Sequence, residues 1–244
     1  REALLAEGLA HLADVFASAP PPGERLDEAS AKALLASYGV IVPESRVVAP
    51  NEAVKAAEEV GFPVALKAVD ARLLHKTEVG AVRIGLSSAQ SVADAVVQMQ
   101  EDMRNLAPHI PLTRVLVEAM APNVVAEVMA SVTYDPSVGP VMMLAGGGIE
   151  AELWGDSTLI AAPFDRVEIA RALDRLKVNA RLEGWRGRPA GDREALLTIL
   201  GSLAQFAQTA GAEEIEVNPI LVGRRGAWAV DAILKLTEAQ EDVA

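Results

Sequence analysis

The stretch EEIEVNPILVGRRGAWAVDA, residues 213–232, decides how the end of this 244-residue chain folds. Apolar and polar residues alternate on both sides of Gly-Arg-Arg-Gly, which is the pattern of a β-hairpin. If Arg224 and Arg225 form the tip, the strands pair symmetrically about them and Asn218 lies opposite Asp231. Cross-strand partners have Cβ atoms about 4.5–5.5 Å apart. We therefore expect the Asn218 amide and the Asp231 carboxylate to lie side by side.

These two side chains suit a hard cation. Mg²⁺ prefers oxygen ligands and keeps part of its shell for water and phosphate, so an amide oxygen and a carboxylate can hold it at a nucleotide. Glu216 lies two residues before Asn218 and therefore on the same face of the strand. The pattern alone leaves open a solvated polar face, which is the commonest fate of such residues. A loop of three or five residues would shift the register by one.

The composition limits the classes of protein to consider. The chain is 51% hydrophobic but only 4% aromatic, which favours an α/β globule with a core of Ala, Val, Leu and Ile. The absence of cysteine excludes disulfides and thiolate chemistry and is consistent with the cytoplasm, where we expect the protein. A net charge of −12 without a basic block argues against nucleic-acid binding. No apolar run approaches the roughly 20 residues of a membrane span.

Helical and strand patterns are mixed along the chain, and several strands look antiparallel, which predicts an α+β fold. We expect two subdomains, at residues 27–112 and 113–238. Residues 1–26 read as a helix followed by a proline-rich linker, and residues 239–244 as a tail. Helices are expected at residues 28–38, 51–60, 88–104, 166–177 and 192–210, and strands within residues 62–69, 82–86, 113–122, 124–136 and 140–148.

Further segments carry residues that could bind an anion. Lys67 follows an apolar strand, where an ammonium group can reach phosphate oxygens. LLHKTEVGAV places His75, Lys76 and Gly80 in one turn, and AGGGIEAE, residues 145–152, is a second glycine segment. Taken singly, each has a plain structural alternative: a snorkelling lysine, a surface histidine or a tight turn.

In combination these segments resemble a known family. They follow in the order GFPVALK, LLHKTEVGAV, VLVEAMAP, AEVMASVTYDPSVGPVMMLAGGGIEAE, IEVNPILV and VD. This order resembles the ATP-grasp part of the NDP-forming acyl-CoA synthetases, a group that includes ADP-forming acetyl-CoA synthetase. It is more distantly similar to the β subunit of succinyl-CoA synthetase. The resemblance covers about residues 27–236 and implies an ATP-grasp fold of two subdomains, with mixed or antiparallel sheets and packed helices.

The resemblance also implies roles for individual residues. Asn218 and Asp231 look like the Mg²⁺ ligands, His75 like a histidine that carries phosphate, and Glu216 like the carboxylate that steadies a phosphohistidine. The nucleotide would be bound by Lys67, Lys76, Glu127 and an adenine hinge made by Glu118, Ala119 and Met120. The candidates for phosphate-binding loops are Gly80, Gly146, Gly147 and Gly148.

The implied reaction is acyl-CoA + NDP + phosphate ⇌ carboxylic acid + CoA + NTP. It would use Mg²⁺ and ATP or ADP, with GTP or GDP as the open alternative. It also requires CoA-binding and ligase domains, so the chain looks like a β subunit or the C-terminal part of a fused synthetase. Its expected partner is the α subunit or N-terminal half, in a hetero- or homo-oligomer, with no nucleic acid and no membrane.

One departure from the family pattern concerns the turn after His75. The family turn usually ends Gly-Gly-Val, whereas this chain has Ala81 in the second position. If that position requires a left-handed backbone or close approach of phosphate, Ala81 would impair it. Two other functions are therefore weighed: a regulatory or scaffold nucleotide-binding module of a larger protein, and an ATP-grasp ligase that joins a carboxylate to an amine without a phosphohistidine.

Overall fold

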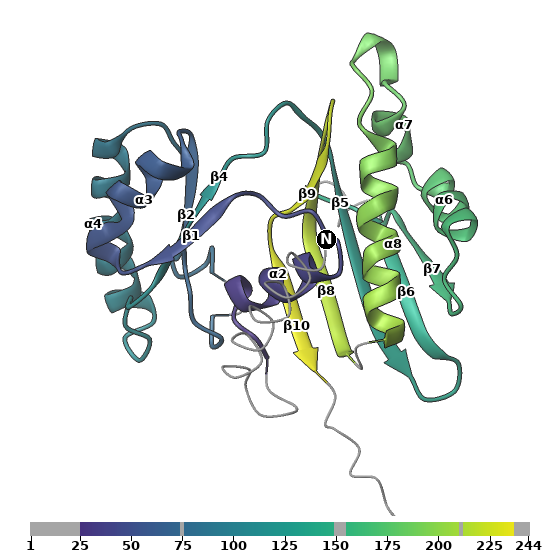
Figure 1. The fold of residues 1–244 in the computed structure, drawn as a ribbon, viewed down its shortest axis with the longest axis horizontal. Helices are drawn as coiled ribbons and strands as arrows, with labels where there is room; N and C mark the ends of the chain where they lie inside the picture. The colour runs from purple at the N-terminus through teal and green to yellow at the C-terminus, as the bar shows by residue number, and fades with distance from the viewer. Residues whose placement is uncertain (1–24, 74–75, 149–154, 210–211, 237–244) are drawn as a thin grey trace, which may run out of the picture. The chain divides into compact units, whose positions relative to one another are not determined.

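The structure is a computed structural model that describes residues 25–73, 76–148, 155–209 and 212–236 (Figure 1). These residues form two compact units. Unit 2 contains residues 27–29 and 43–120, and unit 1 contains the other described residues. The expected division at residue 112 is wrong because strand β4 (Val115–Ala119) pairs with two strands of unit 2. Residues 30–42, expected with the N-terminal subdomain, instead cluster with unit 1.

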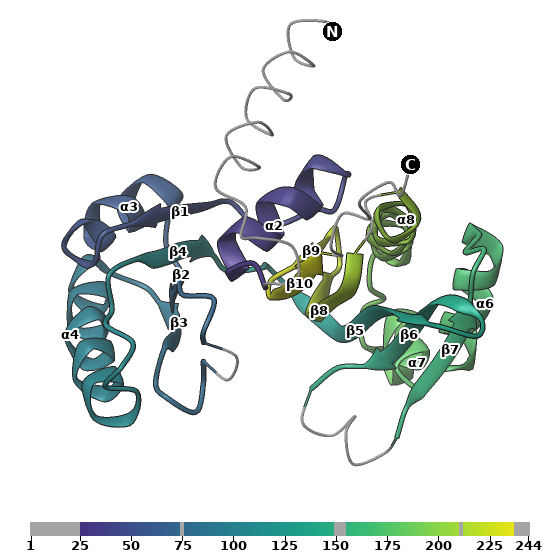
Figure 2. The same ribbon diagram turned by 90° about the horizontal axis from the view of Figure 1, so that it is seen from below.

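Unit 2 is built on a four-stranded antiparallel sheet in the order β1-β4-β2-β3. Its remaining elements are β1 (Ser45–Val48), a 3₁₀ turn (Pro50–Glu52), α3 (Ala53–Val60), β2 (Val64–Ala68), β3 (Val82–Leu86) and α4 (Ala89–Leu106). Figure 2 shows α3 and α4 on the same side of this sheet. The apolar stripe expected on α4 is confirmed, because Val92, Ala95, Val96, Met99 and Met103 are all buried.

Unit 1 is built on a six-stranded antiparallel sheet in the order β10-β8-β5-β6-β7, with β9 also paired to β8. Its strands are β5 (Val124–Asp135), β6 (Gly139–Gly146), β7 (Ser157–Ala161), β8 (Ala212–Gly223), β9 (Ala227–Ala229) and β10 (Ala232–Leu236). Its helices are α2 (Glu28–Ser37, apart from its first two residues), α6 (Arg166–Arg175), α7 (Asn179–Leu182), a 3₁₀ turn (Trp185–Gly187) and α8 (Arg193–Thr209).

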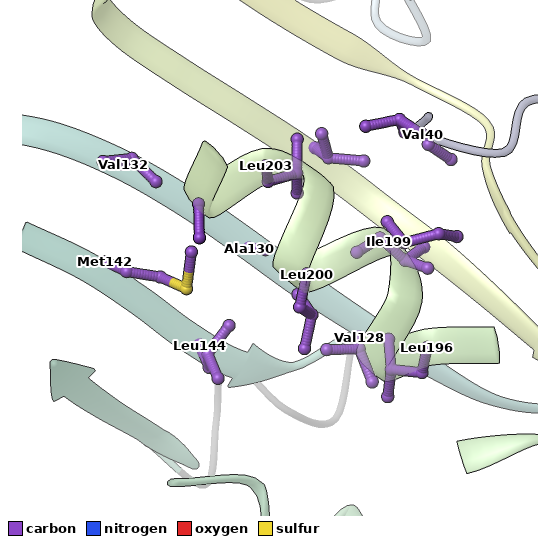
Figure 3. Close-up of a cluster of buried hydrophobic side chains, with 14 of the residues drawn as sticks. Val40, Val128, Ala130, Val132, Met142, Leu144, Leu196, Ile199, Leu200 and Leu203 are labelled. Carbon is purple, nitrogen blue, oxygen red and sulfur yellow. The ribbon is translucent and has the colours of Figure 1, made fainter. Parts of the chain in front are cut away.

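One face of the six-stranded sheet carries the core of unit 1. Figure 3 shows Leu196, Ile199, Leu200 and Leu203 of α8 beside Val128, Ala130 and Val132 of β5 and Met142 and Leu144 of β6. Along β5, the apolar residues Val128, Ala130 and Val132 alternate with half-buried residues that point to the opposite face. These half-buried residues are Glu127, Met129 and Ser131. The sheet therefore has one apolar face under helices and one face that carries polar side chains.

The expected elements are confirmed with shifts of a few residues at their ends. Asp165 accepts a hydrogen bond from the Glu168 amide at 2.7 Å and caps α6, and Gly39, with φ +93°, follows the end of α2. Strands β1 and β7 and the short α7 were not expected. No described helix combines the length and the apolar character that crossing a membrane requires.

Candidate functional site

The hairpin register expected from the sequence is confirmed. Strand β8 pairs with β9 at Ile220↔Ala229 and with β10 at Ala232↔Val217, symmetrically about Arg224–Arg225. The turn is closed by a hydrogen bond from the Gly223 amide to the Gly226 carbonyl at 3.0 Å. At the pair expected from the sequence, the backbone amide of Asn218 donates a hydrogen bond to the backbone carbonyl oxygen of Asp231 at 3.2 Å. Asn218 and Asp231 are therefore neighbours across the hairpin.

The polar residues of this stretch divide into two kinds. Ile215 and Val217 are 1% and 0% exposed on the core face, while Glu216 is half-buried and Asn218 is exposed on the other face. Glu214 has a structural task, because its carboxylate forms an ion pair with Arg25 at 2.8 Å. Glu216, Asn218 and Asp231 carry the other oxygen-bearing side chains that the sequence predicted for the candidate site.

This donor set fits a magnesium ion that is shared with a nucleotide. An amide oxygen and a carboxylate are both hard ligands, and two protein ligands leave most of an octahedral shell to water and phosphate. Among the described residues there is no cluster of three or more His, Asp or Glu that would make a fully protein-ligated site. An amide oxygen and a carboxylate suit Mg²⁺ that is held jointly with a ligand.

Two side chains that the sequence reading missed hold this hairpin in place. Asp192, beside the start of α8, accepts hydrogen bonds from the Gly226 amide at 2.8 Å and the Ala195 amide at 3.0 Å. These bonds, the one from Gly226 first, hold the pKa of Asp192 below its usual value. Lys32, only 3% exposed, donates from Nζ to the carbonyl oxygen of Val230 at 3.2 Å. Both contacts hold the backbone between the two candidate metal ligands.

Glu127 and the second glycine segment are brought together in unit 1. The Gly147 amide donates to the Glu127 carbonyl at 2.7 Å. A Cβ on Gly147 would lie 2.8 Å from the Glu127 Cβ, and one on Gly148 would lie 3.4 Å from Glu127 Oε2. Glycine at 147 is therefore required for the close approach of this segment to β5, whatever else the segment binds. Gly146 ends β6 and donates to the Asp156 carbonyl at 2.9 Å.

The candidate lysines of unit 2 lie in a buried cluster of charges. Lys67 Nζ lies 2.8 Å from Glu28 Oε1 and 2.9 Å from Glu118 Oε1. Lys76 Nζ lies 3.0 Å from Glu28 Oε2, an ion-pair contact without hydrogen-bond geometry. All four residues are less than 10% exposed. Glu28 was not among the expected site residues, because no local pattern links it to residues some 40 positions along the chain.

The turn at residues 76–81 answers the question raised by Ala81. Gly80 has φ +65°, and a Cβ there would lie 2.7 Å from the Asp102 Cβ, so its glycine is explained by a neighbouring carboxylate. Ala81 is not among the described residues with a left-handed backbone, and it is fully buried in the core of unit 2. Its amide donates to the Lys76 carbonyl at 2.8 Å. Alanine therefore fits this position without backbone strain.

The stretch expected to form an adenine hinge is already engaged by backbone hydrogen bonds. The Ala119 amide donates to the Glu44 carbonyl at 2.9 Å, and the Met120 amide donates to the Pro63 carbonyl at 3.1 Å. These two amides are not available as donors to a base in this structure. His75 lies outside the described residues, so its expected role is a prediction that the structure does not address.

An ATP-grasp domain model matches residues 21–236. The β subunit of acetate–CoA ligase [ADP-forming] I of Pyrococcus furiosus is 31% identical over 221 residues, covering 90% of this chain and 95% of that subunit. Trans-feruloyl-CoA synthase FCS1, from an unknown prokaryotic organism, is 33% identical over 85% of this chain but only 30% of its own length. A succinate–CoA ligase β subunit of Natronomonas pharaonis is 31% identical over 56% of its length.

Solved structures agree with these relatives. The dinucleotide-forming acetyl-coenzyme A synthetase 1 of Ca. Korarchaeum cryptofilum, in complex with coenzyme A and Ca-AMPCP, superposes with a TM-score of 0.82 at 30% identity. A second structure of that protein, with coenzyme A and Mg-AMPPCP, gives a TM-score of 0.74 at 30% identity. Each comparison covers 87% of this chain and 93% of the other. The chain therefore belongs to the ATP-grasp domain family, in the group that includes the β subunits of ADP-forming acetate–CoA ligases.

Proposed function

We propose that this chain is the nucleotide-binding, phosphoryl-transferring part of an ADP-forming acyl-CoA ligase. The complete reaction is acyl-CoA + ADP + phosphate ⇌ carboxylic acid + CoA + ATP. The observation that carries the proposal is the hairpin register, which makes Asn218 and Asp231 neighbours within a chain whose relatives are ADP-forming CoA ligases. Because the chain spans almost all of a separate β subunit and about a third of a longer relative, a CoA-binding α subunit or N-terminal half is the proposed partner.

Asn218 and Asp231 hold Mg²⁺ in this proposal. Bound there, the ion would offset the negative charge of the phosphates and orient them for in-line transfer. The presence of Mg-AMPPCP in the Korarchaeum structure supports the same choice of metal and nucleotide. The protein's own contribution is a rigid hairpin, because Asp192 fixes its tip and Lys32 fixes the carbonyl of the residue before Asp231.

Lys67 and Lys76 supply positive charge to the phosphates, and Glu127 lies where its carboxylate meets the glycine segment at 147–148. In the direction of ATP synthesis, His75 carries the phosphoryl group. Its P–N bond breaks as the terminal phosphate oxygen of ADP forms the new P–O bond, and the imidazole nitrogen is released. Glu216 is the carboxylate proposed to steady the phosphohistidine. The phosphoryl group reaches His75 from the acyl-phosphate chemistry of the partner.

The test is calorimetric titration of the chain with ATP, in the presence and in the absence of Mg²⁺. The Asp231→Ala variant should lose the Mg²⁺-dependent part of binding, whereas Glu213→Ala removes a carboxylate from the same strand and should bind like the parent. If Asp231→Ala binds Mg-ATP as tightly as the parent, the hairpin is a solvated polar face and the metal assignment is wrong.

Phosphate transfer is tested separately. With the partner present, labelled phosphate from [γ-³²P]ATP should appear on the chain and be lost in His75→Ala. An ATP-grasp ligase that joins a carboxylate to an amine needs no phosphohistidine, so a silent His75→Ala variant with intact ligase activity would favour that alternative. Binding of ATP without any transfer, in the complete complex, would favour a regulatory module.

A further inference from the structure

Four charged side chains of unit 2 form a buried cluster. Two ammonium groups, of Lys67 and Lys76, face two carboxylates, of Glu28 and Glu118. Their side chains are only 8%, 10%, 2% and 2% exposed, respectively. Buried charges persist only when they are paired. Both lysines assigned to phosphate therefore already have an anion at bonding distance.

Glu28 occupies the position that a phosphate would need. One of its oxygens lies 2.8 Å from Lys67 Nζ and the other lies 3.0 Å from Lys76 Nζ, so the carboxylate bridges the two ammonium groups. A phosphoryl group bound by both lysines would make the same bridge with two of its oxygens. The two anions cannot share these contacts, because like charges a few ångströms apart repel strongly in a buried site.

The two carboxylates differ in how easily they can leave. Glu118 lies within the central strand β4, paired to Ser45 on one side and Ala65 on the other. Its Cα is fixed by the sheet, and its carboxylate contacts Lys67 at 2.9 Å. Glu28 is the first residue of α2, and its contact with Lys76 already lacks hydrogen-bond geometry. A rotation of its side chain would move its carboxylate away from both lysines without breaking a strand.

We propose that Glu28 is a built-in competitor of the nucleotide, an internal anion that holds Lys67 and Lys76 together until phosphate displaces it. This inference rests on the proposed function, since it requires that the two lysines bind phosphate. It adds a residue to the site that sets nucleotide affinity without contacting the base. The pairing with Glu28 also offsets the cost of burying the two ammonium groups.

The test measures binding of Mg-ATP and of adenosine to the parent chain and to Glu28→Gln. Glutamine keeps the size of the side chain and removes its charge, so Mg-ATP should bind roughly tenfold more tightly, which is the size expected for loss of a competing charge-assisted contact. Adenosine has no phosphate, so its affinity should not change. Glu58→Gln, on the exposed surface of α3, makes the same charge change and should shift Mg-ATP affinity less than about twofold.

The outcomes separate the inference from the function on which it rests. If the parent binds Mg-ATP but Glu28→Gln binds it equally or more weakly, Glu28 is only a structural counter-ion and the inference is wrong. If the parent fails to bind Mg-ATP in the complete complex, the proposed function fails and the inference fails with it. Should Glu28→Gln not fold, Glu28→Asp retains the charge on a shorter side chain that cannot bridge both lysines. It should then tighten Mg-ATP binding by a smaller factor, and unchanged or weaker binding would overturn the inference.

Discussion

Replacing Lys67 by methionine tests whether the charge cluster is as buried and as well paired as the structure indicates. Methionine keeps an unbranched side chain of similar length and removes only the ammonium group. Glu28 and Glu118 would then lose their contacts at 2.8 and 2.9 Å while remaining about 2% exposed. Breaking a buried ion pair by removing one partner costs about 3–5 kcal/mol, because a charge is left in a poorly solvated site.

A surface lysine of the same unit provides the control. Lys55 forms an i,i+4 ion pair with Glu59 on α3, at 3.9 Å, and the two side chains are 81% and 53% exposed. Such pairs contribute about 0.3–0.5 kcal/mol. Lys55→Met should therefore change the free energy of unfolding by no more than about 0.5 kcal/mol, well below the loss expected for Lys67→Met.

Urea unfolding followed by far-ultraviolet circular dichroism measures both variants, and hydrogen exchange localises the effect. The amides of β2 and β4 should lose protection in Lys67→Met, while those of α8, in unit 1, should keep it. A loss below about 1 kcal/mol for Lys67→Met would contradict the reasoning. It would mean that solvent reaches the two carboxylates and that the cluster behaves like a surface ion pair.

Three further changes have definite expected outcomes. Gly147→Ala places a Cβ 2.8 Å from the Glu127 Cβ and should lower the free energy of unfolding by about 1–3 kcal/mol. Gly201→Ala, in α8, has no atom within 4 Å of the new methyl group and should raise the free energy of unfolding by up to about 1 kcal/mol. Thermal unfolding measures both variants. Ala81→Gly removes a buried methyl group and should lower the free energy of unfolding by about 1–2 kcal/mol in the same assay. Calorimetry should show no tighter nucleotide binding by this variant. If the variant binds the nucleotide more tightly, a second glycine in the turn matters for binding. The lowered pKa of Asp192 means that its stabilisation is complete above the unfolded pKa of about 3.9 and is lost as the pH falls through the lower folded value. Asp192→Asn should therefore melt below the parent at pH 7, and the difference should shrink as the pH falls below about 4; a difference that does not shrink with falling pH would show that the carboxylate charge is not the cause.

The parts of the fold that could be predicted from the sequence are those with local causes. The hairpin register follows from a symmetric tip and strict alternation, and both lie within 20 residues of sequence. The α4 stripe likewise follows from helical spacing, and every member of it is buried. Strands β1 and β7 were missed because each has only four or five residues and lacks the alternation of a half-buried strand. The boundary at residue 112 was misplaced because β4 pairs with strands far earlier in the chain, which no local pattern records.

The residues of the candidate site also differ in whether a local pattern could suggest them. Residue types with a chemical purpose, such as Asn218, Asp231 and Lys67, could be named from their patterns. The residues that hold them could not, because Asp192 reaches Gly226 across 34 positions and Glu28 reaches Lys67 across 39. Hydrogen bonds and ion pairs over such separations depend on the tertiary fold. The sequence therefore suggests candidates for ligand contact more readily than the groups that position them.

The position of Lys67 shows why this difference matters for function. Its place after an apolar strand predicts a cation for phosphate, yet the structure gives that cation two carboxylates. A lysine neutralised in this way attracts a nucleotide only to the extent that one carboxylate gives way, so its affinity is a difference between two pairings. Substituting Lys67 therefore removes its pairing with the carboxylates and its pairing with phosphate at the same time. Substituting Glu28 alone tests whether the carboxylate and the phosphate compete for the lysine. The sign of the Glu28→Gln effect on binding therefore says more about the site than the size of any lysine effect.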